Sequence, residues 1–443
     1  MTTNLPPGWK ISPLVDVATL IMGQSPESKY YNTSGEGLPF FQGKAEFGEL
    51  YPVVRQYCSA PKKVVEPHDI LLSVRAPVGP TNLAKEDSCI GRGLAGIRPK
   101  KDLNYQFLLY QFRHLEPWLS QQGTGSTFQA INKSFLEKVE ILVPSLSEQK
   151  RIVAKLDHLL ALVDSCRAHL NRAAAAIKRF RQSVLNAAVT GQLTSELNLT
   201  TNTDAKQIAD YLNKQDNLKK NEADKLTVAL DYDLPPHWSS APLGLLVASC
   251  SYGSSQKSAK TGLIPVLRMG NIQSGILDWE DLVYTSDQNE IDKYLLEPGD
   301  VLFNRTNSPE LVGKTAMYKE REPKAIYAGY LIRVKTLPAL NPQFLTYCLN
   351  SSYGRHFSWQ VKTDGVSQSN INATKLSAFP TPICSRKEQD EIVRRVEALL
   401  SKADEMESKL TAARQRADNL TASILAKAFR GELLNCDNKQ GED

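Results

Sequence analysis

The feature that most constrains the fold is an internal repeat that runs through the whole chain. Four segments recur in the same order, namely LPPGW (5–9) as LPPHW (234–238), EPHDILL (66–72) as EPGDVLF (297–303), LNYQFLLY (103–110) as LNPQFLTY (340–347), and 131–193 as 371–433. The last pair aligns without a gap at an offset of 240 residues and is identical at 18 of 63 positions. The offset grows from 229 along the chain, as insertions in surface loops would produce. The sequence therefore predicts one module of roughly 190 residues that is used twice.

The first part of each module is predicted to be a mixed α+β domain of the α/β class. These parts, 1–144 and 234–383, are rich in Gly, Pro and aromatic residues and contain short apolar runs. Apolar runs bounded by turn signals predict strands, and they occur at 70–74, 94–98, 301–303 and 330–334. The repeated LNxQFLxY segment is typical of the start of a helix.

The second part of each module, at 145–193 and 384–433, is predicted to be one long helix. Ser145 with Glu148, and Ser385 with Glu388, have the spacing of a capping box. Apolar residues then recur at steps of three and four, which is typical of a coiled-coil seam. The predicted seam residues are Leu156, Leu159, Val163, Leu170, Ile177, Phe180, Val396, Leu399, Met406, Leu410, Leu420 and Ile424. Gly191 and Gly431 stand where a glycine would end each helix.

We expect the two long helices to pair with each other in an antiparallel coiled coil. Each helix follows its own globular domain, so antiparallel pairing relates the two modules by a pseudo-twofold axis. The polar connector at 194–233 can then span locally, although it is also long enough for parallel pairing. Residues 434–443 form a polar tail.

Composition and motifs favour a binding protein over an enzyme. The formal net charge is +5, which fits a nucleic-acid binder without establishing one. No apolar run reaches 18 residues, no secretory signal is visible and the seven Cys are scattered, so we expect a cytoplasmic chain with free thiols. The segment 308–315 ends in Gly-Lys-Thr, but it lacks the first glycine of a phosphate-binding loop and contains Pro309. We find no metal-ligand or nucleophile motif, and we therefore expect no catalytic residue and no metal site.

The duplicated order of motifs resembles the specificity subunit of type I restriction–modification systems. Each copy opens with LPxxW and continues with an EPxD turn before an apolar strand. Each then has a Gly- and Ser-containing segment, an Ile-Asn pair, an EQxxIV helix start and a long helix closing on Gly-x-Leu. The resemblance covers nearly the whole chain. It implies two target-recognition domains, 1–144 and 234–383, a central helix near 145–193 and a distal helix near 384–433.

The resemblance also implies the function and the partners. Such a subunit is non-catalytic and recognises a bipartite, asymmetric site in double-stranded DNA, one half for each domain. It recruits two methyltransferase subunits and two restriction subunits, the latter being ATP-dependent translocase-nucleases. The chain itself would hold no cofactor, whereas its partners would use S-adenosylmethionine, ATP and Mg.

Candidate DNA contacts are side chains that suit base edges or phosphates and lie beside predicted strands or in small polar loops. Arg and Gln or Asn read guanine and adenine edges, and small polar loops before a helix suit phosphates. The candidates are Gln42, Lys44, Arg75, Thr124, Ser126, Arg268, Asn271, Asn304, Arg305, Asn307, Ser367 and Gln368. For each Arg or Asn, the alternative of an ordinary turn or surface residue has at least the same weight.

Two other functions remain open from the sequence. The chain could serve a related system in which one partner both cuts and methylates DNA. It could instead be a coiled-coil scaffold that binds proteins without DNA specificity. Co-purification separates these possibilities. Only a type I specificity subunit should bring down a separate methyltransferase, and a scaffold should show no sequence-specific retention of DNA.

Overall fold

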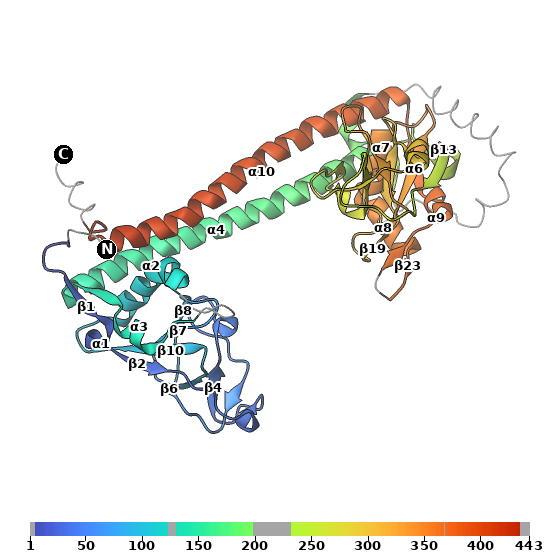
Figure 1. Ribbon diagram of the computed structural model, residues 1–443. Coiled ribbons are helices and arrows are strands. Elements are labelled where there is room, and N and C mark those ends of the chain that lie inside the picture. Colours follow the sequence, from blue (N-terminus) through green and yellow to red (C-terminus); the bar gives the residue numbers. More distant parts are fainter. Residues whose placement is uncertain (1–4, 123–129, 198–231, 367, 435–443) are drawn as a thin grey trace, which may run out of the picture. The chain divides into compact units, whose positions relative to one another are not determined.

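A computed structural model describes residues 5–122, 130–197, 232–366 and 368–434. The chain divides into two compact units. Unit 1 comprises residues 1–172 and 410–443, and unit 2 comprises residues 173–409. Each unit therefore contains one globular domain and a part of both long helices (Figure 1). The boundaries thus cut across the long helices, whereas the sequence suggested a division between globular domains and helices.

The centre of unit 1 is a four-stranded antiparallel sheet in the order β2–β10–β7–β8. A second sheet has the order β3–β5–β4–β9–β6, and β1 pairs with β11. The strands are β1 (Lys10–Pro13), β2 (Ala18–Met22), β3 (Tyr31–Asn32), β4 (Leu38–Phe41), β5 (Tyr57–Cys58), β6 (Val64–Val65), β7 (Ile70–Ser73), β8 (Thr81–Leu83), β9 (Ser88–Ile90), β10 (Leu94–Pro99) and β11 (Glu140–Val143). The helices of this domain are α1 (Leu14–Val17), α2 (Tyr105–Gln122) and α3 (Lys133–Glu137).

Unit 2 repeats this architecture with a sheet in the order β13–β22–β18–β20 and a β12–β25 pair. Its further sheets are β17–β14–β21, β15–β16 and β19–β24–β23. The strands are β12 (Ser239–Pro242), β13 (Val247–Tyr252), β14 (Ile264–Leu267), β15 (Ile272–Gln273), β16 (Ile276–Leu277), β17 (Val283–Thr285), β18 (Val301–Asn304), β19 (Thr306–Asn307), β20 (Thr315–Met317), β21 (Ile326–Tyr327), β22 (Leu331–Thr336), β23 (Thr363–Asp364), β24 (Ser369–Asn370) and β25 (Pro380–Ile383). The helices are α6 (Gln288–Tyr294), α7 (Pro342–Asn350), α8 (Ser352–Val361) and α9 (Ala373–Ser377).

The repeated EPxD motif forms a turn that leads into a strand covered on both faces. In β7, Ile70 and Leu72 face one hydrophobic cluster and Leu71 faces another. Burial on both faces explains why this strand is a continuous apolar run and does not alternate. The turn is closed by Asp69, whose carboxylate accepts a hydrogen bond from the Glu66 backbone N–H at 2.8 Å.

Unit 2 builds the same turn and strand from a different sequence. Asp300 accepts a hydrogen bond from the Glu297 N–H at 2.9 Å. The residue before the aspartate has a positive φ in both units, 73° at His68 and 93° at Gly299. Glycine adopts this conformation without steric cost, whereas a histidine is tolerated less readily. The predicted strands 70–74, 94–98, 301–303 and 330–334 are thus confirmed, with end shifts of one or two residues.

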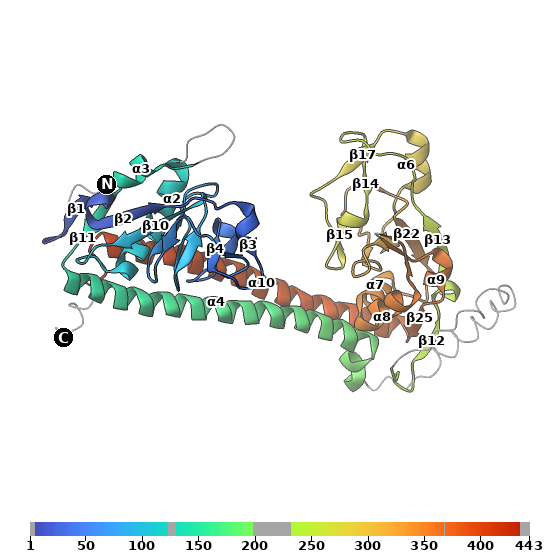
Figure 2. The same cartoon turned by 90° about the horizontal axis from the view of Figure 1, so that it is seen from below.

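The long helices α4 (Leu146–Val189) and α10 (Arg386–Phe429) contain 44 residues each. Within each unit they run antiparallel, as predicted (Figure 2). In unit 1, Arg167 lies 3.1 Å from the Asp418 carboxylate, and in unit 2, Arg181 lies 2.5 Å from that of Asp404. A later residue of α4 therefore faces an earlier residue of α10. Gly191 and Gly431, which follow the helices, have positive φ angles of 73° and 76°.

The predicted seam is confirmed at only part of its positions. The residues that are buried are spaced by seven residues in α4 and by fourteen in α10, and they are Leu156, Val163, Val396, Leu410 and Ile424. Leu159, Leu170, Ile177 and Leu399 are half-buried. The prediction is wrong for Phe180, Met406 and Leu420, whose side chains are 41%, 56% and 49% exposed. A single neighbouring helix covers one central row of side chains, and it leaves the flanking row at the edge of the contact.

Two further observations concern the described residues alone. Their six cysteines are all free thiols, as expected from the scattered spacing. No helix within these ranges combines the length and the apolar character that crossing a membrane requires.

Candidate nucleic-acid interface

The start of each long helix is joined to its globular domain by the same pair of side chains. The Glu148 N–H donates to Ser145 Oγ at 3.3 Å, which forms one half of the predicted capping box. The carboxylate of Glu148 accepts instead from the indole N–H of Trp9 at 2.9 Å. In unit 2, Glu388 accepts from Trp238 in the same way at 3.1 Å. The repeated LPxxW motif therefore places a tryptophan against the first turn of its helix.

A buried glutamine follows this glutamate and completes the junction. The Gln149 carbonyl oxygen accepts from the Asn104 N–H at 2.7 Å. Its amide group donates to the carbonyl oxygens of Asp102 at 3.1 Å and Pro144 at 2.9 Å. Because Asn104 immediately precedes α2, this side chain fixes the position of α2 on α4.

Gln389 makes the same three contacts in unit 2. It accepts from the Asn341 N–H at 2.7 Å and donates to the carbonyl oxygens of Ala339 at 3.0 Å and Cys384 at 2.9 Å. Both glutamines are fully buried. The repeated LN and EQ pairs are therefore two sides of one hydrogen-bonded junction.

The glycine after each long helix packs against the proline that opens a domain. A Cβ built on Gly191 would lie 2.4 Å from Cγ of Pro235, and one on Gly431 would lie 2.3 Å from Cγ of Pro6. Such contacts exclude a side chain at either glycine. Packing thus explains the LPP and Gly-x-Leu motifs. In unit 2 the LPP segment packs at the end of α4, and in unit 1 it packs at the end of α10.

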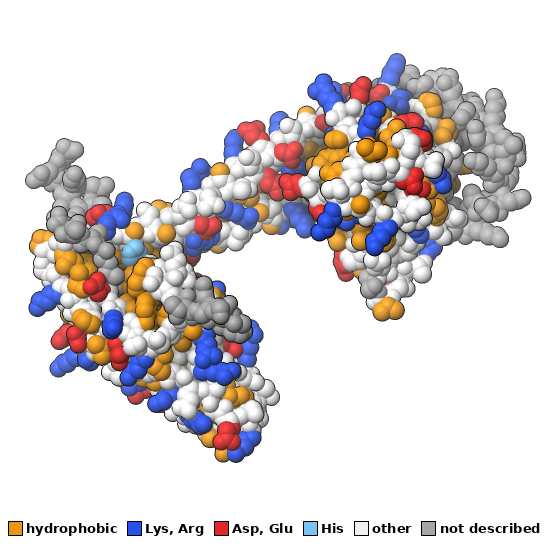
Figure 3. All heavy atoms as spheres, viewed as in Figure 1, with side chains coloured by type: hydrophobic (Ala, Val, Ile, Leu, Met, Phe, Trp, Pro, Cys, Tyr) orange, Lys and Arg blue, Asp and Glu red, His pale blue; other side chains and the backbone are white. Residues whose placement is uncertain are grey.

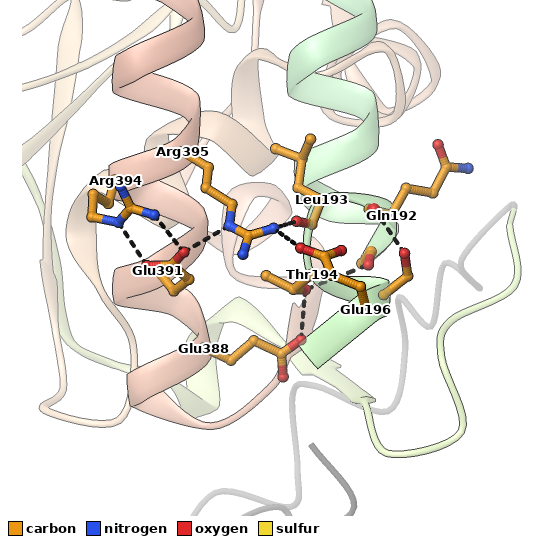
Figure 4. Close-up of polar contacts among 10 residues, drawn as sticks. Gln192, Leu193, Thr194, Glu196, Glu388, Glu391, Arg394 and Arg395 are labelled. Carbon is orange, nitrogen blue, oxygen red and sulfur yellow. Dashed lines mark hydrogen bonds and ion pairs between the residues drawn. The ribbon is translucent and has the colours of Figure 1, made fainter. Parts of the chain in front are cut away.

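Unit 2 adds a polar cluster that holds the 3-10 segment Gln192–Leu197 against α10 (Figure 4). Thr194 donates to the buried Glu388 carboxylate at 2.7 Å. Arg395 donates to the Leu193 carbonyl at 2.5 Å and also pairs with Glu196. Hydrogen bonds from Arg394 and Arg395 lower the pKa of Glu391 to about 2.

Three predicted DNA contacts of unit 1 lie close together in loops at the ends of strands. We call residues 23–25, 42–44, 74–75 and 91–93 the loop edge of unit 1. The Gly91 N–H donates to the Phe41 carbonyl at 2.8 Å, and the Val74 N–H donates to the Gly93 carbonyl at 2.9 Å, so these loops are adjacent. Gln42, Lys44 and Arg75 are exposed there. Within the described parts of the chain, the side chains of Lys44 and Arg75 make neither an ion pair nor a hydrogen bond.

The corresponding loop edge of unit 2 consists of residues 253–254, 268–271, 305–307 and 328–330. Its arginines are engaged within the domain. Arg268 donates to the Asp281 carboxylate at 3.2 Å. Arg305 donates to the Gly329 carbonyl and the Asn370 side chain, each at 3.2 Å, and its guanidinium lies 4.7 Å from the centre of the Tyr252 ring. Arg305 therefore connects its own loop to Gly329, Asn370 and Tyr252, and this is a structural role within the domain.

The remaining candidates fall into three groups. Asn307 is half-buried and accepts from the Ser308 N–H at 2.8 Å, and Gln368 is exposed in the turn between β23 and β24. Asn271 and Asn304 are only 2% and 0% exposed, which contradicts a contact with DNA. Asn271 instead caps a turn by accepting from the Arg268 N–H at 2.9 Å. The candidates Thr124, Ser126 and Ser367 lie outside the described residues.

Sequence reasoning missed two exposed residues of the loop edges, Arg92 and Tyr330. The Arg92 N–H donates to Ser25 Oγ at 3.3 Å, and its side chain is exposed. Tyr330 is 46% exposed, while its carbonyl accepts from the Arg305 N–H at 3.0 Å. A signal was available for Arg92, because it stands between Gly91 and Gly93 directly before a predicted strand.

The Gly-Lys-Thr segment has the geometry of a turn between two strands. The Lys314 ammonium donates to the Gln273 side chain at 3.0 Å, and burial lowers its pKa. The Thr315 hydroxyl is buried and donates to the Gly313 carbonyl at 3.0 Å. No group of His, Cys, Asp or Glu within the described ranges could hold a metal ion.

Comparisons with known proteins agree with this duplicated architecture. Residues 6–173 and 247–413 match the family described as the type I restriction modification DNA specificity domain. The chain is 30% identical over 452 residues to the specificity subunit of the type I restriction enzyme StySPI of Salmonella potsdam, covering 97% of this chain and 90% of that protein. It is 29% identical to the EcoKI specificity subunit of Escherichia coli K12, with the same coverage.

A further relative is similar over one module only. The MjaX protein of Methanocaldococcus jannaschii, a putative type I restriction enzyme specificity subunit, is 41% identical over 193 residues, which is 43% of this chain and 44% of that protein. The family match covers both copies, and the relatives from Salmonella and Escherichia match nearly from end to end. The chain therefore belongs to the specificity subunits of type I restriction–modification systems.

Proposed function

We propose that each unit binds one half of a bipartite, asymmetric site in double-stranded DNA. The observation that carries this proposal is a framework shared by both units with different side chains on its surface. Trp9, Glu148 and Gln149 recur as Trp238, Glu388 and Gln389 with the same contacts. In contrast, Gln42 and Arg268 occupy matching positions after β4 and β14. A common frame with exchanged surface residues suits two different half-sites.

The chain would act as the recognition subunit and leave catalysis to its partners. Methyltransferase subunits would supply S-adenosylmethionine-dependent methylation, and restriction subunits would supply the ATP- and Mg-dependent steps. We expect two copies of each. An apolar row along the long helices supports such recruitment, because Leu162 and Leu420 in unit 1 are 55% and 49% exposed, and Phe180 and Met406 in unit 2 are also exposed. Exposed apolar surface of this kind is typical of a partner interface.

The test is a selection of duplexes from a random DNA pool by the purified full chain. We expect enrichment of two different short sequences separated by a fixed number of unspecified base pairs. Replacing residues 234–383 with the second domain of another family member should change one half-site and preserve the other. Failure to enrich any sequence would contradict DNA recognition, and a change in both half-sites would contradict one domain per half-site.

A further inference from the structure

We propose that the loop edges of units 1 and 2 are one base-reading surface used twice. On this surface, equivalent backbone positions carry different recognition residues, chiefly Arg92 and Arg75 in unit 1 and Tyr330 in unit 2. This inference rests on the proposed function and identifies the residues that distinguish the two half-sites.

The backbone of the two loop edges is held by matching hydrogen bonds. In unit 1, the donors and acceptors are Gly23 N–H to Leu94 O (2.9 Å), Gly91 N–H to Phe41 O (2.8 Å), Val74 N–H to Gly93 O (2.9 Å) and Ile131 N–H to Val74 O (3.0 Å). In unit 2, they are Gly253 N–H to Leu331 O (3.4 Å), Ala328 N–H to Leu267 O (2.9 Å), Arg305 N–H to Tyr330 O (3.0 Å) and Ile371 N–H to Arg305 O (2.9 Å). Each of these four bonds of unit 1 has its counterpart in unit 2.

These matching bonds define which residues are equivalent. Val74 corresponds to Arg305, so the exposed Arg75 corresponds to Thr306. The strand pairing supports this equivalence independently. Arg75 forms a β-bridge with Ala130, and Thr306 pairs with Asn370, which follows Ala130 by the same 240 residues that separate the two modules. Likewise, Gly93 corresponds to Tyr330, and Arg92 corresponds to Gly329.

Close packing keeps this backbone unchanged while the surface varies. A Cβ on Gly23 would lie 2.1 Å from the Gly91 carbonyl oxygen, and one on Gly253 would lie 2.2 Å from that of Tyr327. Both contacts are too short for any side chain, so the two glycines are required by the frame. Gly93 is restricted as well, because a Cβ there would lie 2.2 Å from the Gln42 carbonyl oxygen, whereas Arg75, Arg92 and Tyr330 carry side chains at exposed positions.

The loop edge of unit 1 carries three exposed cations, and one of them, Lys44, interacts electrostatically with the half-buried Glu116. Arg75, Arg92 and Lys44 are exposed, and within the described ranges their side chains form no ion pair. The carboxylate of the nearby Glu46 is hydrogen-bonded to the backbone, where it accepts from the N–H groups of Gln42 at 3.3 Å and Gly43 at 3.0 Å. Figure 3 shows Lys and Arg side chains gathered over the β4 and β7 region of unit 1.

This chemistry fits guanine. An arginine binds O6 and N7 of guanine with two hydrogen bonds, and cations near the groove attract phosphates. We therefore infer that the half-site of unit 1 contains a guanine read by Arg92 or Arg75.

The loop edge of unit 2 presents different chemistry on the same frame. Its arginines are paired within the domain, as described above, whereas Tyr330 and the adjoining Tyr252 of β13 are 46% and 43% exposed. A tyrosine offers a hydroxyl that donates or accepts and a ring that contacts apolar groups such as the thymine methyl. The half-site of unit 2 would thus be read by an aromatic side chain at the place where unit 1 has glycine.

The experiment compares the full chain with Arg92→Ala, Arg92→Lys and Tyr330→Ala variants in the same DNA selection, at one salt concentration. Arg92→Ala should lower affinity for the selected site roughly tenfold or more and relax preference within one half-site only. Arg92→Lys should relax the same position while retaining affinity for unrelated DNA, because the charge remains but the paired hydrogen bonds do not. Tyr330→Ala should relax the other half-site only.

Lys101→Ala is the matched control, because this exposed cation lies beyond the opposite end of β10. It should leave the selected sequence unchanged. If folded Arg92→Ala and Tyr330→Ala variants select the wild-type sequence with wild-type affinity, the assignment of the loop edges is overturned. If the wild-type chain itself selects no sequence, the proposed function has failed before this inference is tested.

Discussion

A single buried amide explains why a Glu-Gln pair occurs at the start of both long helices. Each glutamine satisfies one backbone N–H and two carbonyl oxygens from two segments, the one before α2 or α7 and the one before its own helix. A buried backbone group without a partner costs about 1–3 kcal/mol. The glutamine therefore does more than pack, because its loss would leave three such groups unpaired in a closed space.

Replacing Gln389 with alanine should lower the free energy of unfolding of unit 2 by about 3 kcal/mol. Hydrogen exchange measured by mass spectrometry should show faster exchange in α7 and at the start of α10. Peptides of the globular domain of unit 1 should be unaffected. Gln415→Ala is the control, since Gln415 is exposed and its amide donates to the neighbouring Asn419 side chain at 3.3 Å. Unchanged exchange in α7 would show that the junction does not depend on this amide.

At the scale of elements, the capping residues and closing glycines predicted the bounds of the long helices, but the heptad spacing did not predict the burial of all their side chains. The predicted helix at 145–193 and the observed α4 (Leu146–Val189) agree to within one residue at the start and four at the end. The heptad pattern wrongly predicted burial of Phe180 and Met406, because periodicity shows which face of a helix is apolar and not how many neighbours cover it. A two-helix contact covers less of that face than a larger bundle would.

The loop edges show the same division between what the sequence predicts and what it leaves open. Strand ends could be located from apolar runs, and this identified Gln42, Lys44 and Arg75. Whether a polar residue beside a strand is exposed depends on contacts between distant segments. Asn271, for example, turns inward to bond with Asp278 and Asp281, and no local pattern indicates this.

The exposed apolar row makes a specific prediction about assembly. Co-purification with a Met406→Glu variant should yield about tenfold less methyltransferase than with the wild type, because the interface would have to bury an unpaired carboxylate. The Ser408→Glu variant adds the same charge at an exposed position two residues further along α10, on another face of the helix. It should assemble normally. Equal recovery of methyltransferase by both variants would remove Met406 from the partner surface.

At the scale of the whole molecule, both long helices are continuous between the two units. α4 begins in unit 1 and ends in unit 2, and α10 begins in unit 2 and ends in unit 1. Arg167 faces Asp418 in unit 1 and Arg181 faces Asp404 in unit 2, and along the chain Ala173 lies between the two arginines and Ala413 between the two aspartates. Adding seven residues after each alanine therefore preserves the heptad register of both helices.

This double insertion should lengthen the unspecified gap in the DNA site. Seven residues add about 10 Å of helix, and duplex DNA rises about 3.4 Å per base pair, so the gap should grow by roughly three base pairs. Both half-sites should stay the same, because the loop edges are untouched. Affinity should fall, since three base pairs rotate the groove by about 100° at 10–10.5 base pairs per turn. Selection from a DNA pool with randomised gap lengths measures the effect, and an unchanged gap in a folded, binding variant would mean that the helices do not set the spacing.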